Sequence, residues 1–105
     1  MTSPQFRYDL DEQRGVLAVH GDLDEPATVE LRETIAKATD DLTSQLAIDL
    51  ADVTFMPSPA IGVLATSQAK ARRNGTDVVL VAPSGTIAQR LLTICALDHV
   101  ESLDA

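Results

Sequence analysis

The chain has 105 residues, of which 45% are hydrophobic and only 3% aromatic, so we expect a single globular domain over residues 1–105 with an aliphatic core. Its formal net charge is −8 at pH 7. An acidic surface repels phosphate groups, which argues against nucleic acid and membrane surfaces as partners and favours a protein with a basic patch.

The first part of the chain predicts a β-hairpin followed by a helix. Residues 6–10 alternate between apolar and polar side chains, and residues 16–19 form a second, apolar strand. Asp24 is placed to cap the helix that follows, and Pro26 falls in its first turn, where a missing N–H costs little. Apolar residues then recur at helical spacing through residues 27–42, which predicts a helix over that range.

The middle of the chain predicts a central strand and a second helix. Residues 46–55 alternate in hydrophobicity and are the best candidate for the central strand. The helix expected over residues 59–73 is stopped by Asn74 and Gly75. The short apolar run at residues 77–83 is typical of a buried strand.

The last part predicts a third helix over residues 84–97, with Ser84 as its cap, and a short closing strand over residues 99–103. Cys95 lies among apolar residues of this helix, so we expect a buried, inert thiol. A single cysteine cannot form an internal disulfide, and the first residues lack the pattern of a signal peptide, so we expect a cytoplasmic protein.

Strands and helices that alternate after an opening hairpin predict the α/β class, with packed helices on a mixed sheet of four or five strands. We expect no catalytic site, because the side chains that catalysis needs are not grouped. The histidines, His20 and His99, are far apart, and an exposed position at the end of a strand explains His20 more simply than acid–base work with Asp22 and Asp24. Cysteine spacing for zinc and glycine-rich phosphate loops are both missing, so we expect no metal and no cofactor.

The segment "FMPSPAIG" places Ser58 between two prolines, after the central strand and before the second helix. Pro59 favours extended backbone angles at Ser58, which suit a helix cap whose hydroxyl accepts from the N–H of Ala60 or Ile61. A hydroxyl at the end of a central strand is also exposed, and sites in open α/β sheets often lie there. The wide apolar arc of the following helix is compatible with deep packing or with docking of a protein.

The sequence resembles the STAS domain of bacterial anti-sigma factor antagonists over nearly its whole length. "VHGDLDEPATVELRETI" resembles the family segment that reads Gly, Glu or Asp, Leu, Asp and continues into the first helix. "LAIDLADVTFMPSPAIGVLATSQAKARRNG" resembles the central run, whose typical form contains Asp, Ser, Ser or Thr, Gly after the strand. "TIAQRLLTICALDHV" resembles the closing helix and last strand.

The resemblance implies a non-enzymatic domain that binds an anti-sigma factor, which is also a serine kinase. It implies that this kinase phosphorylates Ser58 and that a phosphatase reverses the reaction. The chain departs from the motif at three positions, with Pro57 for aspartate, Pro59 for the second hydroxyl residue and Ala60 for the first glycine, so phosphorylation of Ser58 is a conditional expectation. The residues expected to contact the partner are Asp24, Ser58, Ile61, Gly62 and Leu64.

Two alternatives remain open from the sequence. One is a STAS domain that works without phosphorylation, as a scaffold or subunit of a regulatory or transport complex. The other is a small ligand-binding domain that uses the N–H groups at the start of the second helix.

Overall fold

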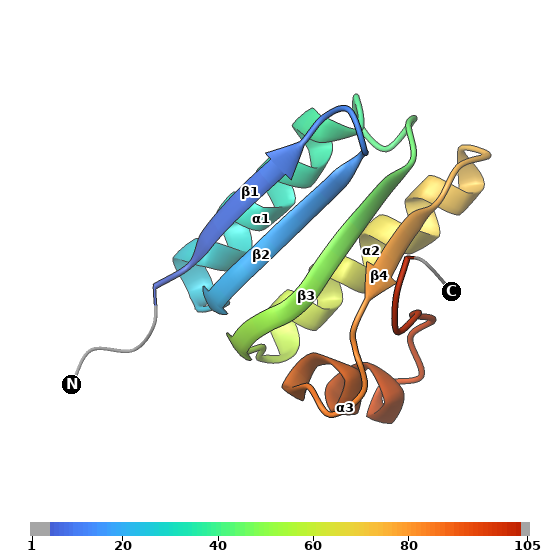
Figure 1. Ribbon diagram of the computed structural model, residues 1–105. Helices are drawn as coiled ribbons and strands as arrows, with labels where there is room; N and C mark the ends of the chain where they lie inside the picture. The colour runs from blue at the N-terminus through green and yellow to red at the C-terminus, as the bar shows by residue number, and fades with distance from the viewer. Residues whose placement is uncertain (1–4, 104–105) are drawn as a thin grey trace.

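The computed structural model describes residues 5–103 and contains a four-stranded sheet with three helices (Figure 1). In chain order the elements are β1 (Arg7–Asp11), β2 (Val16–Asp22), α1 (Glu25–Ala38), β3 (Leu46–Phe55), α2 (Ser58–Arg73), β4 (Val78–Val81) and α3 (Ile87–Ile94). The strand order is β1-β2-β3-β4; β1 is antiparallel to β2, whereas β2, β3 and β4 are parallel. The predicted α/β class with a mixed sheet is therefore confirmed.

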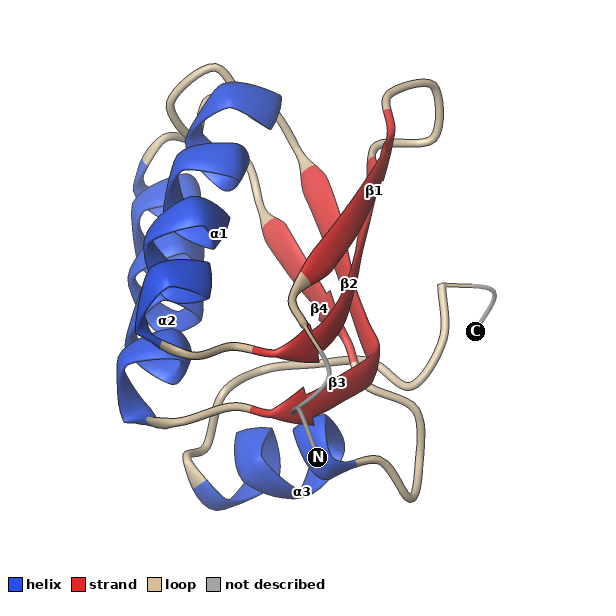
Figure 2. Ribbon diagram, turned by 90° about the vertical axis from the view of Figure 1, so that its left-hand side faces the viewer, coloured by secondary structure: helices blue, strands red, loops and turns tan. Residues whose placement is uncertain are grey.

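Both long helices cover the same face of the sheet. The chain passes from β2 through α1 to β3, and from β3 through α2 to β4, and each connection joins parallel neighbours. When two crossover connections have the same handedness and move across the sheet in the same direction, their helices lie on the same face of the sheet. Figure 2 shows α1 and α2 side by side on that face, with α3 at the carboxyl end of the strands. Among residues 5–103 no helix covers the opposite face of the sheet.

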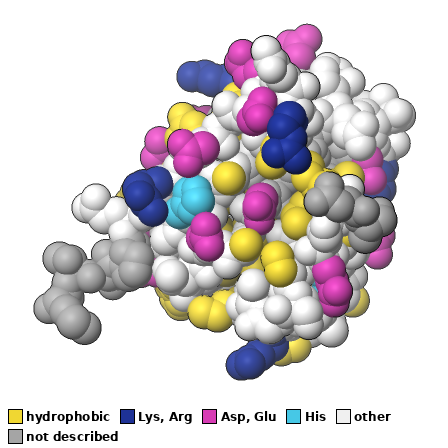
Figure 3. Space-filling model, in the orientation of Figure 1, with side chains coloured by type: hydrophobic (Ala, Val, Ile, Leu, Met, Phe, Trp, Pro, Cys, Tyr) yellow, Lys and Arg dark blue, Asp and Glu magenta, His cyan; other side chains and the backbone are white. Residues whose placement is uncertain are grey.

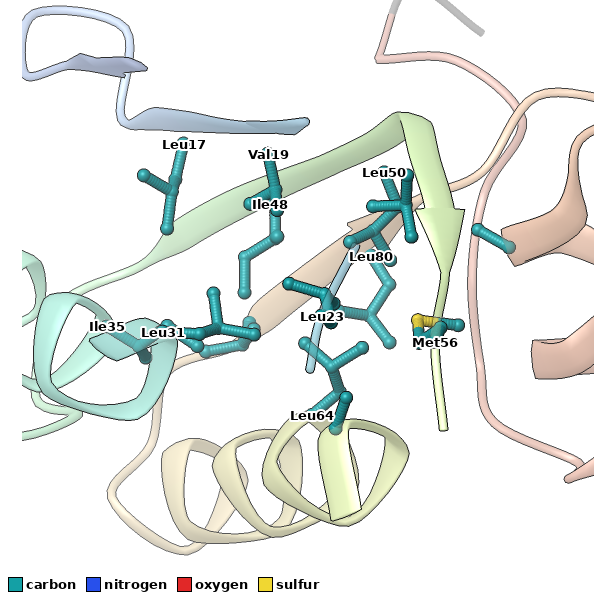
Figure 4. Packing of buried hydrophobic residues seen from close by; sticks show 14 of the residues in the cluster. Leu17, Val19, Leu23, Leu31, Ile35, Ile48, Leu50, Met56, Leu64 and Leu80 are labelled. Carbon is teal, nitrogen blue, oxygen red and sulfur yellow. The ribbon is translucent and has the colours of Figure 1, made fainter. Parts of the chain in front are cut away.

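The core lies between the sheet and the two long helices. Alternate residues of β2 are buried, as the period of a strand requires, and Leu17 and Val19 point toward the helices. Figure 4 shows these side chains packed with Leu31 and Ile35 of α1 and with Leu64 of α2. The aliphatic core expected from the composition is confirmed.

The helix predicted over residues 27–42 ends earlier than expected, at Ala38. Thr39 ends it, because its hydroxyl donates to the carbonyl of Ile35 at 2.7 Å and accepts from the N–H of Leu42 at 2.8 Å. The chain then turns through left-handed backbone angles at residues 40–42. Leu42 is still buried in the core. Its apolar side chain therefore fits the helical spacing in the sequence although its backbone is not helical.

The third helix also begins later than predicted, and Ser84 does not cap it. Gly85 has a φ of +87°, which turns the chain before the helix, and Thr86 takes the cap position. The hydroxyl of Thr86 accepts from the N–H of Gln89 at 3.1 Å.

Two expectations for the carboxyl-terminal part are wrong. Cys95 is exposed, because α3 ends at Ile94 and the cysteine lies at its cap. The closing strand over residues 99–103 is not formed; a single parallel bridge joins Val81 to Val100 instead.

Polar contacts hold the end of α2 against the segment that follows α3. The Nη1 atom of Arg72 lies 3.0 Å from Oδ2 of Asp98, and its Nε atom lies 3.4 Å from Oδ1 of Asp77. The hydrogen bond to Asp98 is the main cause that raises the pKa of Arg72. The amide of Gln68 donates to the carbonyl of Asp98 at 2.9 Å and to that of Val78 at 3.2 Å.

Candidate functional site

The carboxyl ends of β2 and β3 bring the starts of α1 and α2 to one edge of the sheet (Figure 1). Asp22 is in register with Phe55, and the N–H of Leu23 donates to the carbonyl of Phe55 at 2.8 Å. Each helix begins within a few residues of this pair. Asp24 and Ser58 therefore share the edge at which open α/β sheets tend to carry their sites.

Asp24 caps α1, as predicted. Its backbone is extended, and its Oδ1 atom accepts from the N–H of Ala27 at 3.0 Å. The hydroxyl of Thr28 donates to the Asp24 carbonyl at 2.8 Å, which fixes the same turn from the other side. The Asp24 side chain remains exposed, so a carboxylate stands at this edge of the sheet.

Ser58 does not cap α2, contrary to the prediction. Pro57 occupies the cap position, with φ −73° and ψ 171°, and Ser58 is the first helical residue. A proline already has the φ that a cap requires, and its carbonyl accepts from the N–H of Ile61 at 3.2 Å. Pro59 favours extended backbone angles at Ser58, but Ser58 is helical, so the cap geometry of Pro57 outweighs that preference. Within residues 5–103 the exposed hydroxyl of Ser58 has no hydrogen-bond partner.

The start of α2 offers few N–H groups to an anion. Pro59 has none, and the N–H of Ala60 donates to the carbonyl of Pro57 at 3.0 Å. Helix starts bind anions through such groups, so a proline at the cap and a second proline in the first turn weaken this one.

The other residues expected at the partner surface differ in exposure. Gly62 is exposed, and a Cβ placed there would meet nothing within 4 Å. Ile61 is half-buried, but Leu64 is fully buried in the core. The expected contact between Leu64 and a partner is therefore wrong, because the helix turns this side chain toward the sheet (Figure 4). A groove of about 610 Å³ between α1 and α2 includes Pro59 and Gly62 in its lining.

Sequence reasoning missed an apolar surface at the same end of the sheet. Phe55 is 53% exposed, and α3, which packs against β3, leaves Ile87 47% and Ile94 72% exposed. The signal was present in the sequence: Ile87 and Ile94 follow the helical spacing i, i+7, and they lie beside the buried face that holds Leu92. A helix with two apolar stripes buries only one of them against its own domain.

Acidic residues are missing from the segments of α2 and α3. The chain has 16 Asp and Glu residues, but none lies between Val53 and Thr76 or between Val78 and Leu97. The segments that form α2, α3 and the turn before α2 thus carry no carboxylate. Depletion of charge is typical of the buried centre of protein–protein interfaces.

His20 lies on the helix-free face of the sheet, two residues before the end of β2. Its Nδ1 atom is 3.0 Å from Oδ2 of Asp52, and its Nε2 atom is 3.4 Å from Oδ2 of Asp9. Asp22 instead accepts a hydrogen bond from the hydroxyl of Thr54. Figure 3 shows that acidic, basic and small apolar side chains are mixed on this face.

Among residues 5–103 no group of His, Cys, Asp and Glu has the arrangement of a metal site. In the same part of the chain, no helix has the length and hydrophobicity to cross a membrane.

Comparisons with known proteins agree with this architecture. Residues 6–103 match the profile of a family described as "Mlab, STAS domain". The chain is similar to the structure of an anti-sigma factor antagonist from Mycobacterium paratuberculosis, with 23% identity and a TM-score of 0.78 over 95% of this chain and 89% of that one.

It is also similar to the anti-sigma factor antagonist SpoIIAA in its unphosphorylated form, with 18% identity and a TM-score of 0.66 over 89% of this chain and 82% of that one. For the phosphorylated form of the Bacillus cell fate determinant SpoIIAA, the identity is 15% and the TM-score 0.62, over 89% and 85%. These likenesses show a common fold. Together with the family match over residues 6–103, they identify the chain as a member of the STAS domain family.

Proposed function

We propose that this chain is a cytoplasmic, non-enzymatic STAS domain over residues 1–105, which binds an anti-sigma factor that is also a serine kinase. The observation that carries the proposal is the exposed hydroxyl of Ser58, which has no hydrogen-bond partner among residues 5–103 and lies with the Asp24 cap at the adjacent ends of two parallel strands. The family resemblance assigns the phosphorylated serine to Ser58. SpoIIAA, which has the same fold, has been solved in unphosphorylated and phosphorylated forms.

The proposed docking surface consists of Asp24, Ser58, Ile61 and Gly62. Leu64 supports this surface from the core and is not a contact. The exposed Phe55 at the end of β3 extends the surface toward α3. Because α2 and α3 carry no carboxylate, Asp24 is the one carboxylate among these surface residues that a partner must pair or leave in water.

Phosphorylation of Ser58 would act on binding and leave the fold in place. The group adds up to about two negative charges next to Asp24 and Asp22. The first turn of α2 has few N–H groups with which to compensate that charge, because of Pro57 and Pro59. The added charge would therefore lie in the docking surface and raise the cost of desolvating it when the partner binds. A phosphatase would restore binding.

The second candidate is a STAS domain that works as a scaffold or subunit of a regulatory or transport complex, without phosphorylation. The observation that favours it is the cap of α2, where Pro57 removes the family's aspartate and stiffens the segment that a kinase must bind. The same prolines count against a small-ligand site at this helix start, since such a site depends on free N–H groups.

Calorimetric titration with an anti-sigma factor kinase from the same genome tests the docking surface. We expect Ile61→Glu to weaken binding by about fivefold to thirtyfold or more, because a half-buried apolar contact at an interface contributes about 1–2 kcal/mol or more. The matched control is Val29→Glu, which makes the same kind of change at an exposed position of α1 and should leave the affinity unchanged. Equal affinity for the wild type and Ile61→Glu would exclude this surface.

A further inference from the structure

The outer edge of β1 has backbone groups available for another strand. Within residues 5–103 no strand pairs with this side of β1. The carbonyl of Asp11 accepts from the N–H of Gly15 at 2.9 Å, so the backbone groups of Asp11 face the hairpin. Backbone groups alternate along a strand, and those of Tyr8 and Leu10 therefore face away from the sheet.

A groove of about 380 Å³ runs beside this edge, between β1 and α1. Tyr8, which is 41% exposed, and the half-buried Leu10 form its apolar part. Figures 1 and 2 both show β1 at the rim of the sheet with α1 alongside. An open strand edge next to a helix is the arrangement that accepts an extended peptide by strand addition.

The charge of this groove selects the kind of peptide. Three carboxylates, Glu12, Glu30 and Glu33, line it against one ammonium group, Lys37. Among residues 5–103 none of these four side chains forms an ion pair. The groove thus presents a net negative charge that the chain itself does not compensate, and cationic side chains complement it.

We propose that this β1 groove binds an extended segment of a partner protein that has Lys or Arg at every second position. The segment adds a strand to β1 through the outward backbone groups of Tyr8 and Leu10. Its cationic side chains point toward α1, where their aliphatic stems cover Tyr8 and Leu10 and their charged ends reach Glu30 and Glu33. The groove lies apart from the Ser58 edge, so this proposal does not depend on the function proposed above.

The test uses the full chain labelled with ¹⁵N and a nine-residue peptide that alternates lysine and valine. We expect the largest amide shifts along β1, centred on Tyr8 and Leu10. A peptide of equal length that alternates glutamate and valine should give none. Shifts centred on another part of the chain, or equal shifts with both peptides, would refute the proposal.

Three variants make the test specific. Glu30→Lys should weaken binding at least about threefold, whereas Glu101→Lys, the same charge change in the segment after α3, should have a smaller effect. Leu10→Pro should abolish binding, because it removes an outward N–H while the hydrogen bonds between β1 and β2 remain. Equal losses for Glu30→Lys and Glu101→Lys would show attraction to overall charge only and would overturn the inference. Glu30, which is exposed on α1, keeps the test independent of how Leu10→Pro folds.

Discussion

The cap of α2 gives the sharpest test of the local structure around Ser58. Pro57 has the backbone angles of a cap but no side-chain oxygen, so the first turn of α2 lacks the hydrogen bond that Asp24 supplies to α1. Pro57→Asp would add an oxygen that can accept from the N–H of Ala60, which donates to the carbonyl of Pro57 in the wild type, and it would restore the residue that the family motif has at this position.

The expected gain follows from the structure. A side-chain cap raises the free energy of unfolding by about 1 kcal/mol, and a carboxylate at a helix start raises it by about 0.5 kcal/mol more. Loss of the proline lowers the free energy of unfolding by about 0.4–1 kcal/mol, because the unfolded chain becomes more flexible. Pro57→Ala loses the same proline without gaining a cap. The free energy of unfolding of the aspartate variant should therefore be about 1.5 kcal/mol higher than that of the alanine variant. The wild type should fall between them.

Urea denaturation of the three proteins measures these differences directly, with thermal melts as a second measurement. A gain of this size corresponds to a rise of about 6 °C between Pro57→Ala and Pro57→Asp. Equal stability of the two variants would refute the assignment of Pro57 as the cap of α2, because a cap position distinguishes alanine from aspartate.

Three further predictions concern neighbouring features. Asp24→Ala should lower the free energy of unfolding by about 1 kcal/mol in urea denaturation, because the N–H of Ala27 loses its acceptor; an unchanged midpoint would contradict the cap. Cys95 should react with a thiol reagent in the native protein as fast as in urea, since it is exposed; a thiol protected until unfolding would contradict the end of α3. Incubation with the anti-sigma factor kinase and ATP should phosphorylate Ser58 slowly and incompletely by intact mass, and faster in Pro57→Asp, with Ser58→Ala as the control. Rapid, complete phosphorylation of the wild type would show that the prolines do not hinder the kinase.

Local patterns in the sequence predicted most of the fold. The alternation in β2 and β3 and the cap at Asp24 depend on neighbouring residues only, and these predictions are confirmed. The ends of the elements were harder, because two local preferences compete there. At Ser58 the bias from Pro59 competed with the cap geometry of Pro57, and near α3 two hydroxyl residues flank Gly85, of which only Thr86 caps.

The exposure of side chains near the candidate site depended on tertiary contacts that the sequence does not display. Leu64 and Ile61 both belong to the apolar arc of α2, and only the rotation of the helix against the sheet decides that Leu64 is buried. Cys95 was expected to be buried with its apolar neighbours, but it lies one residue beyond the end of α3. Burial of Gln68 is explained by its hydrogen bonds to the carbonyls of Val78 and Asp98, which are distant in sequence.

The binding footprint of the anti-sigma factor kinase on the ¹⁵N-labelled chain tests the central proposal most directly. If the carboxyl edge of the sheet is the docking surface, amide signals should shift or broaden at Asp24, Ser58, Ile61 and Gly62, and those of the His20 face should stay unchanged. A footprint confined to the helix-free face, with the start of α2 unaffected, would contradict the proposed function.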